Sequence, residues 1–256
     1  MEHTGRQTTW KSGRFQSRPR SGTRLLHAAL LFLFAFLVGR TPFLGEYFPA
    51  AIALTACLAS RNPIYIYLAI PAGAGIFCCI RTGVDAWSEL IAVIGCALLF
   101  AGVKKIHLDL WHRALIAGSV GILSLSIYRL ATATVNKTGA GELLVYGIMI
   151  AGFFFLWEGF FRASKEEQGG LLSLAGLTVA WILAVCGTGA GFLLWPAAIF
   201  LILSVLCYGQ TGETAVVITI AGIIAFLAGQ TQWGFMLSLL MGASAAEFFR
   251  RFGSIV

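Results

Sequence analysis

The segment LLHAALLFLFAFLV, residues 25–38, is apolar except for His27. Similar apolar runs follow one another, separated by short polar joints, until the double arginine Arg250-Arg251. The hydrocarbon core of a bilayer is about 30 Å thick, and a helix of roughly 20 apolar residues crosses it. The composition agrees, with 58% hydrophobic and 11% charged residues and a mean hydropathy of +0.85. The sequence therefore predicts an all-α membrane protein.

The apolar runs predict a polytopic transmembrane bundle of about ten helices. Several runs are short for a perpendicular span, which predicts a thin local bilayer, interfacial anchoring or pairing into hairpins. Prolines weaken the second run, at Pro49, and the third, at Pro71. We expect a basic, disordered cytoplasmic arm over residues 1–24 and a transmembrane helical domain over residues 25–256. In chain order, the runs are 25–38, 48–59, 64–80, 87–103, 115–128, 143–160, 171–186, 192–208, 215–228 and 235–249.

The lysines and arginines are distributed unevenly over alternate joints. Of the 18 in the chain, all but four lie on one set of joints, which includes both chain ends. Cytoplasmic loops are enriched in lysine and arginine. The asymmetry therefore predicts an even number of helices with both termini in the cytoplasm. The four residues on the opposite set are Arg40, Arg81, Arg129 and Lys137.

The net charge of +7 follows mostly from this topology. A basic arm is also a feature of nucleic-acid-binding proteins, but the arm offers no folded platform on which bases stack. We expect it instead to lie near anionic lipid head groups, where each cation contributes about 1 kcal/mol. The bilayer is thus the predicted partner, and nucleic acid is not.

Cysteine and histidine do not form a recognisable metal or redox motif. The six cysteines all fall inside apolar runs and include no C-x-x-C pair, so we interpret them as small buried side chains. His107 and His112 lie beside Asp109 in a basic joint, but their spacing of five does not place both on one helix face. The sequence predicts no cofactor and no metal site.

Three carboxylates touch the apolar runs, namely Glu89, Glu158 and Glu247. Ionisable residues within a membrane span are candidates for function. Each of the three lies near a predicted helix end, where we expect it to reach the head-group region. Glu158 lies deepest and is the candidate intramembrane polar site, and a specific role such as an interhelical hydrogen bond is the alternative to solvation near the head groups.

Small residues recur within the runs at a spacing of four, which allows close helix packing. A second glycine pattern, Gly187, Gly189 and Gly191, resembles a phosphate loop, but no strand precedes it and we expect a turn. The sequence therefore predicts a packed bundle without identifying a dimer face. The small-residue pairs are Ala69/Gly73, Ala180/Ala184, Ala221/Ala225 and Gly242/Ala246.

The order of segments at the start of the chain resembles a known family. After the basic arm, the first run ends in Gly39-Arg40, and the stretch TPFLGEYFPAAIA over residues 41–53 follows. An alanine- and glycine-rich stretch comes next, at residues 69–75. Together these segments resemble the N-terminal membrane domain of stage II sporulation protein E. The positions that carry the resemblance include Gly39, Arg40, Glu46 and Pro49.

This resemblance implies a multi-pass anchor of about ten helices in the plasma membrane of a spore-forming bacterium. In the family, the membrane domain holds a PP2C-type serine phosphatase at the asymmetric division septum, and the phosphatase leads to activation of the first forespore sigma factor. The implied partners are the cell-division tubulin homologue, other septal proteins and a second copy of the chain. Manganese would belong to the phosphatase domain. Because the sequence ends at Val256, soon after the last run, we expect the chain itself not to be an enzyme.

Arg40 and Glu46 flank the predicted turn between the first two helices. A cation suits the C-terminus of a helix dipole, so we expect Arg40 to cap the first helix. We also expect it to hold the hairpin to the second span through Glu46. The alternative is that a single external arginine is simply tolerated, since a surface ion pair contributes at most about 1 kcal/mol.

Two other functions remain open from the sequence. A small-solute transporter also suits about ten helices with short loops, although the spans lack recognisable paired buried charges and an inverted repeat. A membrane-embedded enzyme would need a cluster of polar residues at one depth, and the sequence reveals none.

Overall fold

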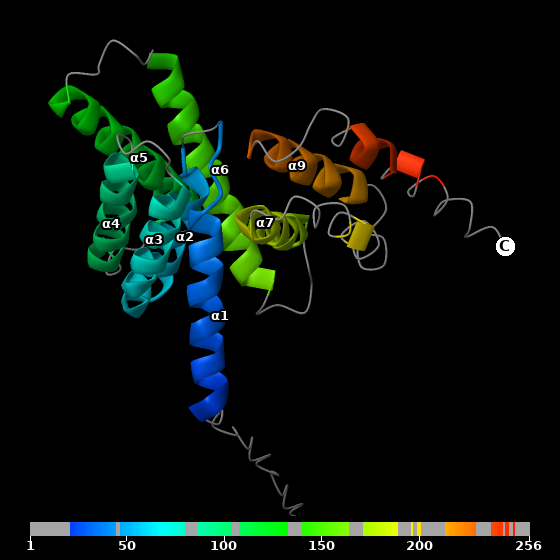
Figure 1. Ribbon diagram of the computed structural model, residues 1–256, viewed down its shortest axis with the longest axis horizontal. Coiled ribbons are helices and arrows are strands. Elements are labelled where there is room, and N and C mark those ends of the chain that lie inside the picture. Colours follow the sequence, from blue (N-terminus) through cyan, green and yellow to red (C-terminus); the bar gives the residue numbers. More distant parts are fainter. Residues whose placement is uncertain are drawn as a thin grey trace, which may run out of the picture.

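The computed structural model describes residues 21–44, 47–79, 86–103, 108–132, 140–163, 171–188 and 213–228, together with residues 196, 199–200, 237–242, 244–245 and 248. Within these ranges the protein is all-helical apart from its connections (Figure 1). The helices are α1 (Ser21–Gly39), α2 (Pro49–Arg61), the 3-10 helix η1 (Pro63–Leu68), α3 (Ala69–Cys79), α4 (Ala86–Val103), α5 (Leu110–Ala131), α6 (Ala140–Ala163), α7 (Leu171–Thr188) and α9 (Glu213–Leu227).

Eight of the ten predicted apolar runs coincide with described helices. Most of the run at 192–208 and part of the run at 235–249 lie outside the described residues, as do residues 1–20 of the predicted arm. Two boundaries differ from expectation. Helix α1 begins at Ser21, inside the predicted arm, and α5 begins at Leu110, five residues before the predicted run.

Three of the described helices are long and apolar enough to cross a membrane by length and composition. They are α4, α5 and α6. The other apolar helices are shorter, with apolar segments of 10 to 17 residues. Large apolar side chains such as Leu98, Leu123 and Ile148 are exposed on the outer faces of the three long helices. The coarse prediction of an all-helical protein is therefore confirmed for the described part of the chain, and three of its helices are candidate membrane spans.

The short helix α2 lies at the centre of the protein. Every residue from Pro49 to Ala59 is buried, and α2 packs against both α4 and α6. Most of these side chains are alanine or another small residue, so neighbouring helices can approach on all sides. Pro49 does not break the helix, contrary to expectation. It occupies the first turn, where a helix needs no backbone N–H donor.

The third apolar run is divided into η1 and α3. Asn62 ends α2 in an extended conformation and accepts a hydrogen bond from the backbone N–H of Ile64 through its side chain, at 3.2 Å. Pro63 then begins η1, and Pro71 lies in the first turn of α3. Both prolines therefore lie near helix starts, where their missing N–H groups are tolerated.

Glycines mark the closest helix crossings. A Cβ on Gly75 of α3 would overlap the carbonyl oxygen of Phe36 on α1, and one on Gly39 would overlap the carbonyl oxygen of Ala72. Gly187, predicted to lie in a turn, instead lies in the last turn of α7, packed directly against the backbone of Leu37. The turn prediction for Gly187 is wrong because the glycine serves close packing. Gly189 and Gly191 lie outside the described residues.

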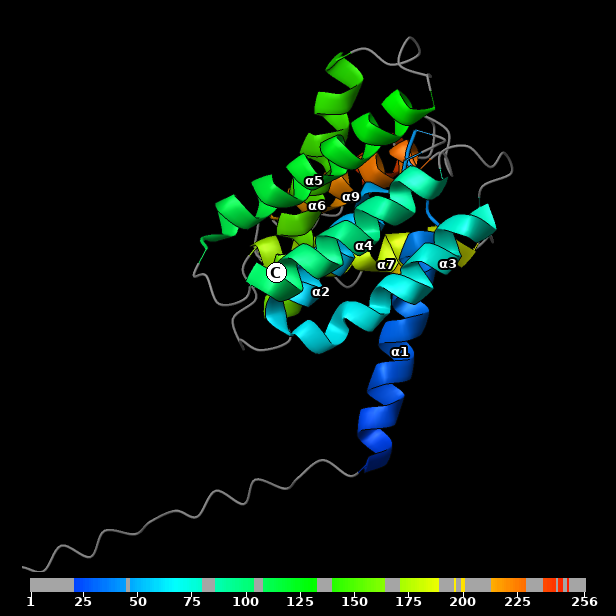
Figure 2. The same ribbon diagram turned by 90° about the vertical axis from the view of Figure 1, so that its left-hand side faces the viewer.

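Helix α1 crosses the other helices only along its C-terminal half. Its N-terminal half extends away from them in both views (Figures 1 and 2). Leu25, Leu26 and Leu30 are correspondingly exposed. At the other end of α1, the Thr41 hydroxyl lies 3.2 Å from the carbonyl oxygens of Leu37 and of Leu183 on α7. This end of α1 is therefore attached to both α3 and α7.

Candidate functional site: two buried polar clusters

The first polar cluster joins the C-terminal ends of α2 and α6. Nη2 of Arg61 lies 2.9 Å from Oε1 of Glu158, and Nε of Arg61 donates to Oε2 at 3.2 Å. The guanidinium also faces the ring of Phe161 at 5.3 Å. The thiol of Cys57 lies 3.5 Å from Oε2 of the same carboxylate. Both charges are thus paired and largely withdrawn from solvent.

Glu158 is 8% exposed. Glu158 is therefore enclosed by protein rather than solvated, with Arg61 as its counter-charge, and its depth relative to the head groups stays a prediction. The expectation that the spans lack paired buried charges is wrong because of this ion pair. The neighbouring residue Trp157 donates its indole N–H to the carbonyl oxygen of Ala50 at 2.9 Å. Two consecutive residues of α6 therefore bind α2, one through charge and one through a neutral hydrogen bond.

The second cluster joins the α1–α2 connection to the facing ends of α5 and α6. Tyr47 donates its phenol proton to the carboxylate of Glu142 and accepts from Nη2 of Arg129 at 3.0 Å. Arg129 is only 8% exposed, although it carries a full charge. Burying a charge without a partner is costly. Tyr47 gives the guanidinium a hydrogen-bond acceptor and links it to the exposed carboxylate of Glu142.

A buried carboxylate adjoins this second cluster. Tyr146 of α6 donates to Oε2 of Glu89 on α4 at 2.7 Å, and its ring lies 5.1 Å from that of Tyr47. Glu89 is 1% exposed. The expectation that it is solvated near a helix end is wrong, because its side chain is enclosed within the bundle, where Tyr146 supplies a hydrogen-bond partner. Polar side chains from α4, α5, α6 and the α1–α2 connection therefore meet at one end of the bundle.

The two clusters lie at opposite ends of α6. Glu142 and Glu158 are sixteen residues apart, which corresponds to about 24 Å along a helix. The buried side chains between them include Ile150, Phe153 and Phe154. The interior of the bundle is therefore apolar over a length that approaches the roughly 30 Å thickness of a bilayer core, with charge at both ends.

The residues of the predicted hairpin motif have structural neighbours. Arg40 lies beside the ring of Phe36 at 5.9 Å, and its carbonyl oxygen accepts from the thiol of Cys79 at 2.8 Å. Gly39 forms the crossing with α3, and Pro49 begins α2. Glu46 lies outside the described residues, so the proposed pairing of Arg40 with Glu46 stays a prediction.

Histidine and cysteine behave as isolated side chains in the described ranges. His112 lies 3.8 Å from Asp109 on the exposed start of α5, and His107 lies outside the described residues. Cys57, Cys78, Cys79, Cys96 and Cys186 are free thiols. Among the described residues, no three histidines, cysteines or acids are grouped as metal ligands would be. The described histidines and cysteines are therefore not treated as a common site.

Sequence reasoning missed five participants, namely Tyr47, Arg61, Arg129, Glu142 and Tyr146. A signal existed for the three charged ones. Arg61 and Glu158 end two runs that the distribution of cations assigns to the same side, and Arg129 and Glu142 border one joint. Matching opposite charges at the same predicted depth would have paired Arg61 with Glu158 and placed Arg129 near Glu142, where Tyr47 hydrogen-bonds to both. The tyrosines carry no comparable signal, because tyrosine is common wherever helices end near an interface.

Comparison of the chain with protein-family models, with curated proteins and with solved structures found no match.

The pKa of Tyr47 leads to a testable pH dependence. Burial and, to a lesser extent, the hydrogen bond to Glu142 raise its pKa from 10.0 to about 12. The unfolded chain therefore loses this proton near pH 10, whereas the folded protein keeps it until about pH 12. The stability that the phenol contributes is complete below pH 10 and is lost as the pH rises from about 10 to 12. We expect a steeper fall in the free energy of unfolding over this interval than in Tyr47→Phe. Parallel curves for the two proteins would exclude a raised pKa at Tyr47.

Proposed function

We propose that the chain is a multi-pass membrane anchor with about ten helices and both ends in the cytoplasm. Its role is that of the membrane domain of stage II sporulation protein E. In this role it positions a PP2C-type serine phosphatase at the asymmetric division septum of a spore-forming bacterium, and that phosphatase leads to forespore sigma-factor activation. The proposed partners are the lipid bilayer, further copies of the chain, the cell-division tubulin homologue and other septal proteins.

One observation carries this proposal. Apart from the exposed Leu44, the described residues of the stretch that resembles the family, residues 39–44 and 47–53, lie mostly in the interior of the bundle. Gly39 makes the crossing with α3, Phe43 packs on Phe153 of α6 at 4.9 Å, and α2 is buried along nearly its whole length. The segments that carry the resemblance thus take part in assembling the helical bundle, which supports the proposed role.

The arrangement of charge supports the proposed topology. Arg61 and Glu158 lie at one end of the bundle, and Arg129 and Glu142 lie at the other. The distribution of cations assigns the first end to the cytoplasm and the second to the external side. Arg61 and Arg129, which the distribution of cations assigns to opposite sides of the membrane, thus also lie at opposite ends of the bundle.

A fluorescent fusion in a sporulating bacterium tests the septal role. We expect the fused chain to concentrate at the asymmetric septum, because its membrane domain carries the targeting information. The signal is normalised to a membrane dye, since two membranes lie at the septum and a uniformly distributed protein also appears brighter there. A dye-normalised signal that is even around the cell would reject septal targeting while leaving the membrane topology intact.

A small-solute transporter is a second candidate, and the cluster around Tyr47, Arg129 and Glu89 favours it. Buried polar side chains that connect several helices are typical of solute pathways in membranes. Uptake measurements in vesicles that contain the purified chain distinguish the two functions. Uptake that is lost in Glu89→Gln and retained in Ile127→Trp, a substitution on the exposed face of α5, would favour transport. Septal targeting without uptake would favour the anchor.

A further inference from the structure

The connection between α1 and α2 contains a backbone conformation that is uncommon for a residue other than glycine. Leu44 has a φ of 51°, which lies in the left-handed region that is sterically unfavourable for L-residues. Its side chain is 54% exposed, so packing of the leucine does not hold it in this conformation. Strained residues of this kind persist where surrounding contacts impose them, and they are frequent in segments that switch between states. The backbone contacts of the connection therefore hold Leu44 in place.

The backbone N–H of Leu44 binds a helix that is distant in the sequence. It donates to the carbonyl oxygen of Leu227 at 2.8 Å. Leu227 is the last residue of α9, and the last four carbonyl groups of a helix have no partner within that helix. Among the described helices, α9 packs mainly against α7, and Figure 1 shows it on the side of α6 away from α4 and α5. Leu44 therefore supplies a second attachment for α9.

The same connection reaches the second polar cluster. Phe43 and Tyr47 exchange two backbone hydrogen bonds, at 2.6 and 3.0 Å, so Tyr47 is tied to the residue that precedes Leu44. The phenol of Tyr47 donates to Glu142 of α6 and accepts from Arg129 of α5. A few residues of backbone thus join the end of α9 to the side chains between α5 and α6.

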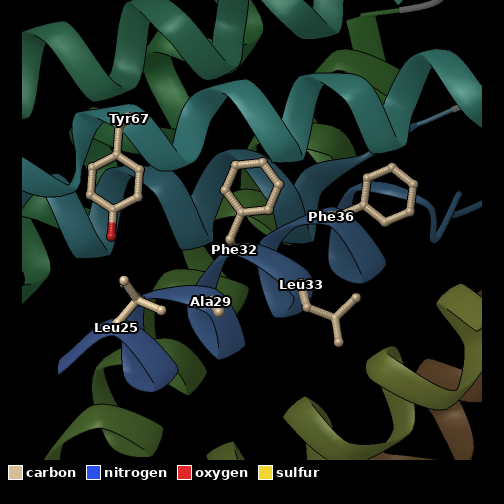
Figure 3. Close-up of a pocket in the computed structure, with 7 residues that line it drawn as sticks. Leu25, Ala29, Phe32, Leu33, Phe36 and Tyr67 are labelled. Atoms are coloured by element: carbon tan, nitrogen blue, oxygen red, sulfur yellow. The ribbon is translucent and has the colours of Figure 1, made fainter. Parts of the chain in front are cut away.

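The N-terminal half of α1 does little to fix this connection in place. Figure 3 shows Tyr67 of η1 pointing towards α1, along which Leu25, Ala29 and Phe32 lie. These residues line an open apolar groove of about 660 Å³, so α1 and η1 are not closely packed there. The contacts that hold α1 lie at its other end, where Thr41 binds the backbone of α7. The position of the connection therefore depends on contacts at its own end of the bundle.

We propose that the α1–α2 connection is a latch that couples the position of α9 to the second polar cluster. In the latched state, which the structure shows, Leu44 binds α9 and Tyr47 binds its two charged partners. When α9 moves away from α7, Leu44 loses its acceptor and relaxes to an ordinary conformation, and the phenol of Tyr47 leaves its partners. The coupling is reciprocal, so loss of the Tyr47 contacts also loosens the end of α9. The latch goes beyond the anchor function and depends on neither septal targeting nor uptake.

Fluorine NMR of the full chain in lipid nanodiscs tests the coupling from α9 to the cluster. A fluorinated tyrosine at position 47 gives a single reporter signal. Ala225→Trp places a large ring on the buried side of α9 and should displace this helix. We expect the signal to shift towards its position in Glu142→Ala, which removes the acceptor of the phenol directly. Ile223→Trp, on the exposed side of the same helix, is the matched control and should leave the signal unchanged.

Hydrogen exchange tests the coupling in the opposite direction. Glu142 is exposed, so Glu142→Ala leaves the apolar core intact. It should nevertheless speed the exchange of the Leu44 amide and of the amides in the last turn of α9. Asp109→Ala removes an exposed carboxylate at the opposite end of α5 and should change neither rate. Peptide mass spectrometry of the exchanged protein measures both segments.

Two substitutions at Leu44 test the strained backbone itself. Leu44→Gly keeps the N–H donor and removes the steric cost of a positive φ, so the latched state should become more populated. The amide of residue 44 should then exchange more slowly, after correction for its intrinsic rate. Leu44→Ala removes the exposed side chain but retains the steric cost, so its amide should exchange as in the unmodified protein.

Several results would overturn the latch. An unchanged fluorine signal in Ala225→Trp, or unchanged exchange in Glu142→Ala, would mean that α9 and the polar cluster are independent. Equal shifts in Ala225→Trp and Ile223→Trp would indicate a general disturbance of the bundle and contradict a specific coupling. If Ala225→Trp does not accumulate as folded protein, the exchange measurements on Glu142→Ala decide, because that substitution alters an exposed side chain.

Discussion

Replacing Glu158 with alanine is expected to lower the free energy of unfolding by about 3–5 kcal/mol. The substitution removes the carboxylate that binds Arg61 at 2.9 Å and leaves the guanidinium without its charge partner between α2 and α6. It also removes the acceptor near the thiol of Cys57. Arg61→Ala should cost a similar amount, because it leaves the carboxylate uncompensated. Equilibrium unfolding of the purified protein in detergent measures both losses.

The double variant distinguishes a buried pair from two independent residues. Arg61→Met/Glu158→Met removes both charges and keeps side chains of similar length, so its cost should be well below the sum of the two single losses. The exposed pair of His112 and Asp109 serves as the matched control. Asp109→Asn should change stability by no more than about 0.5 kcal/mol. Additive losses in the double variant would contradict a coupled ion pair.

The crossing of α1 and α3 leads to the second large effect. Gly75→Ala introduces a methyl group that overlaps the backbone carbonyl of Phe36 and lies within 3.0 Å of Gly39 and Arg40 atoms. Backbone cannot rotate away as a side chain can, so the two helices must separate. Overpacking of this kind typically costs about 1–3 kcal/mol, and the upper part of that range is expected here. Thermal unfolding in detergent should register a lowered midpoint.

Gly152 on α6 provides the matched control for Gly75. Nothing lies within 4 Å of a Cβ built on Gly152, so Gly152→Ala adds a methyl group without a clash. Alanine is favoured over glycine inside a helix by about 0.5–1 kcal/mol, and we therefore expect slight stabilisation. A similar loss of stability in both variants would mean that the close approach at Gly75 does not hold α1 and α3 together.

The helices were predictable because each apolar run carries its own signal. Runs of the composition of residues 87–103 allow few structures other than helix in an apolar environment. The prolines led to a wrong expectation because the effect of a proline on a helix depends on its position within that helix. Pro49 at the start of α2 fits the helix, whereas the same residue in its middle would break it. Local sequence thus predicts that a helix forms, whereas the exact ends of the helix depend on tertiary contacts.

The polar clusters were only partly predictable. Glu158 was identified as a candidate because a carboxylate in an apolar run is unusual. Its partner Arg61 lies almost a hundred residues away, and Tyr47 reaches Glu142 and Arg129 from a connection. Such contacts depend on which helices are neighbours, a property that hydropathy does not specify. Glu89 was misjudged for the same reason, since its burial and its hydrogen bond to Tyr146 depend on which helices surround the start of α4.

The central claim is that α5 and α6 cross the membrane as a pair whose connection lies outside the cytoplasm. Topology reporters inserted at residues 133–139 and fused after Val256 test this claim most directly. We predict opposite compartments, with the insertion external and the C-terminal fusion cytoplasmic, because Arg129 and Lys137 lie on the cation-poor set of joints. If both reporters were found on the same side of the membrane, the proposed topology would be wrong, and with it the assignment of the two polar clusters to opposite faces.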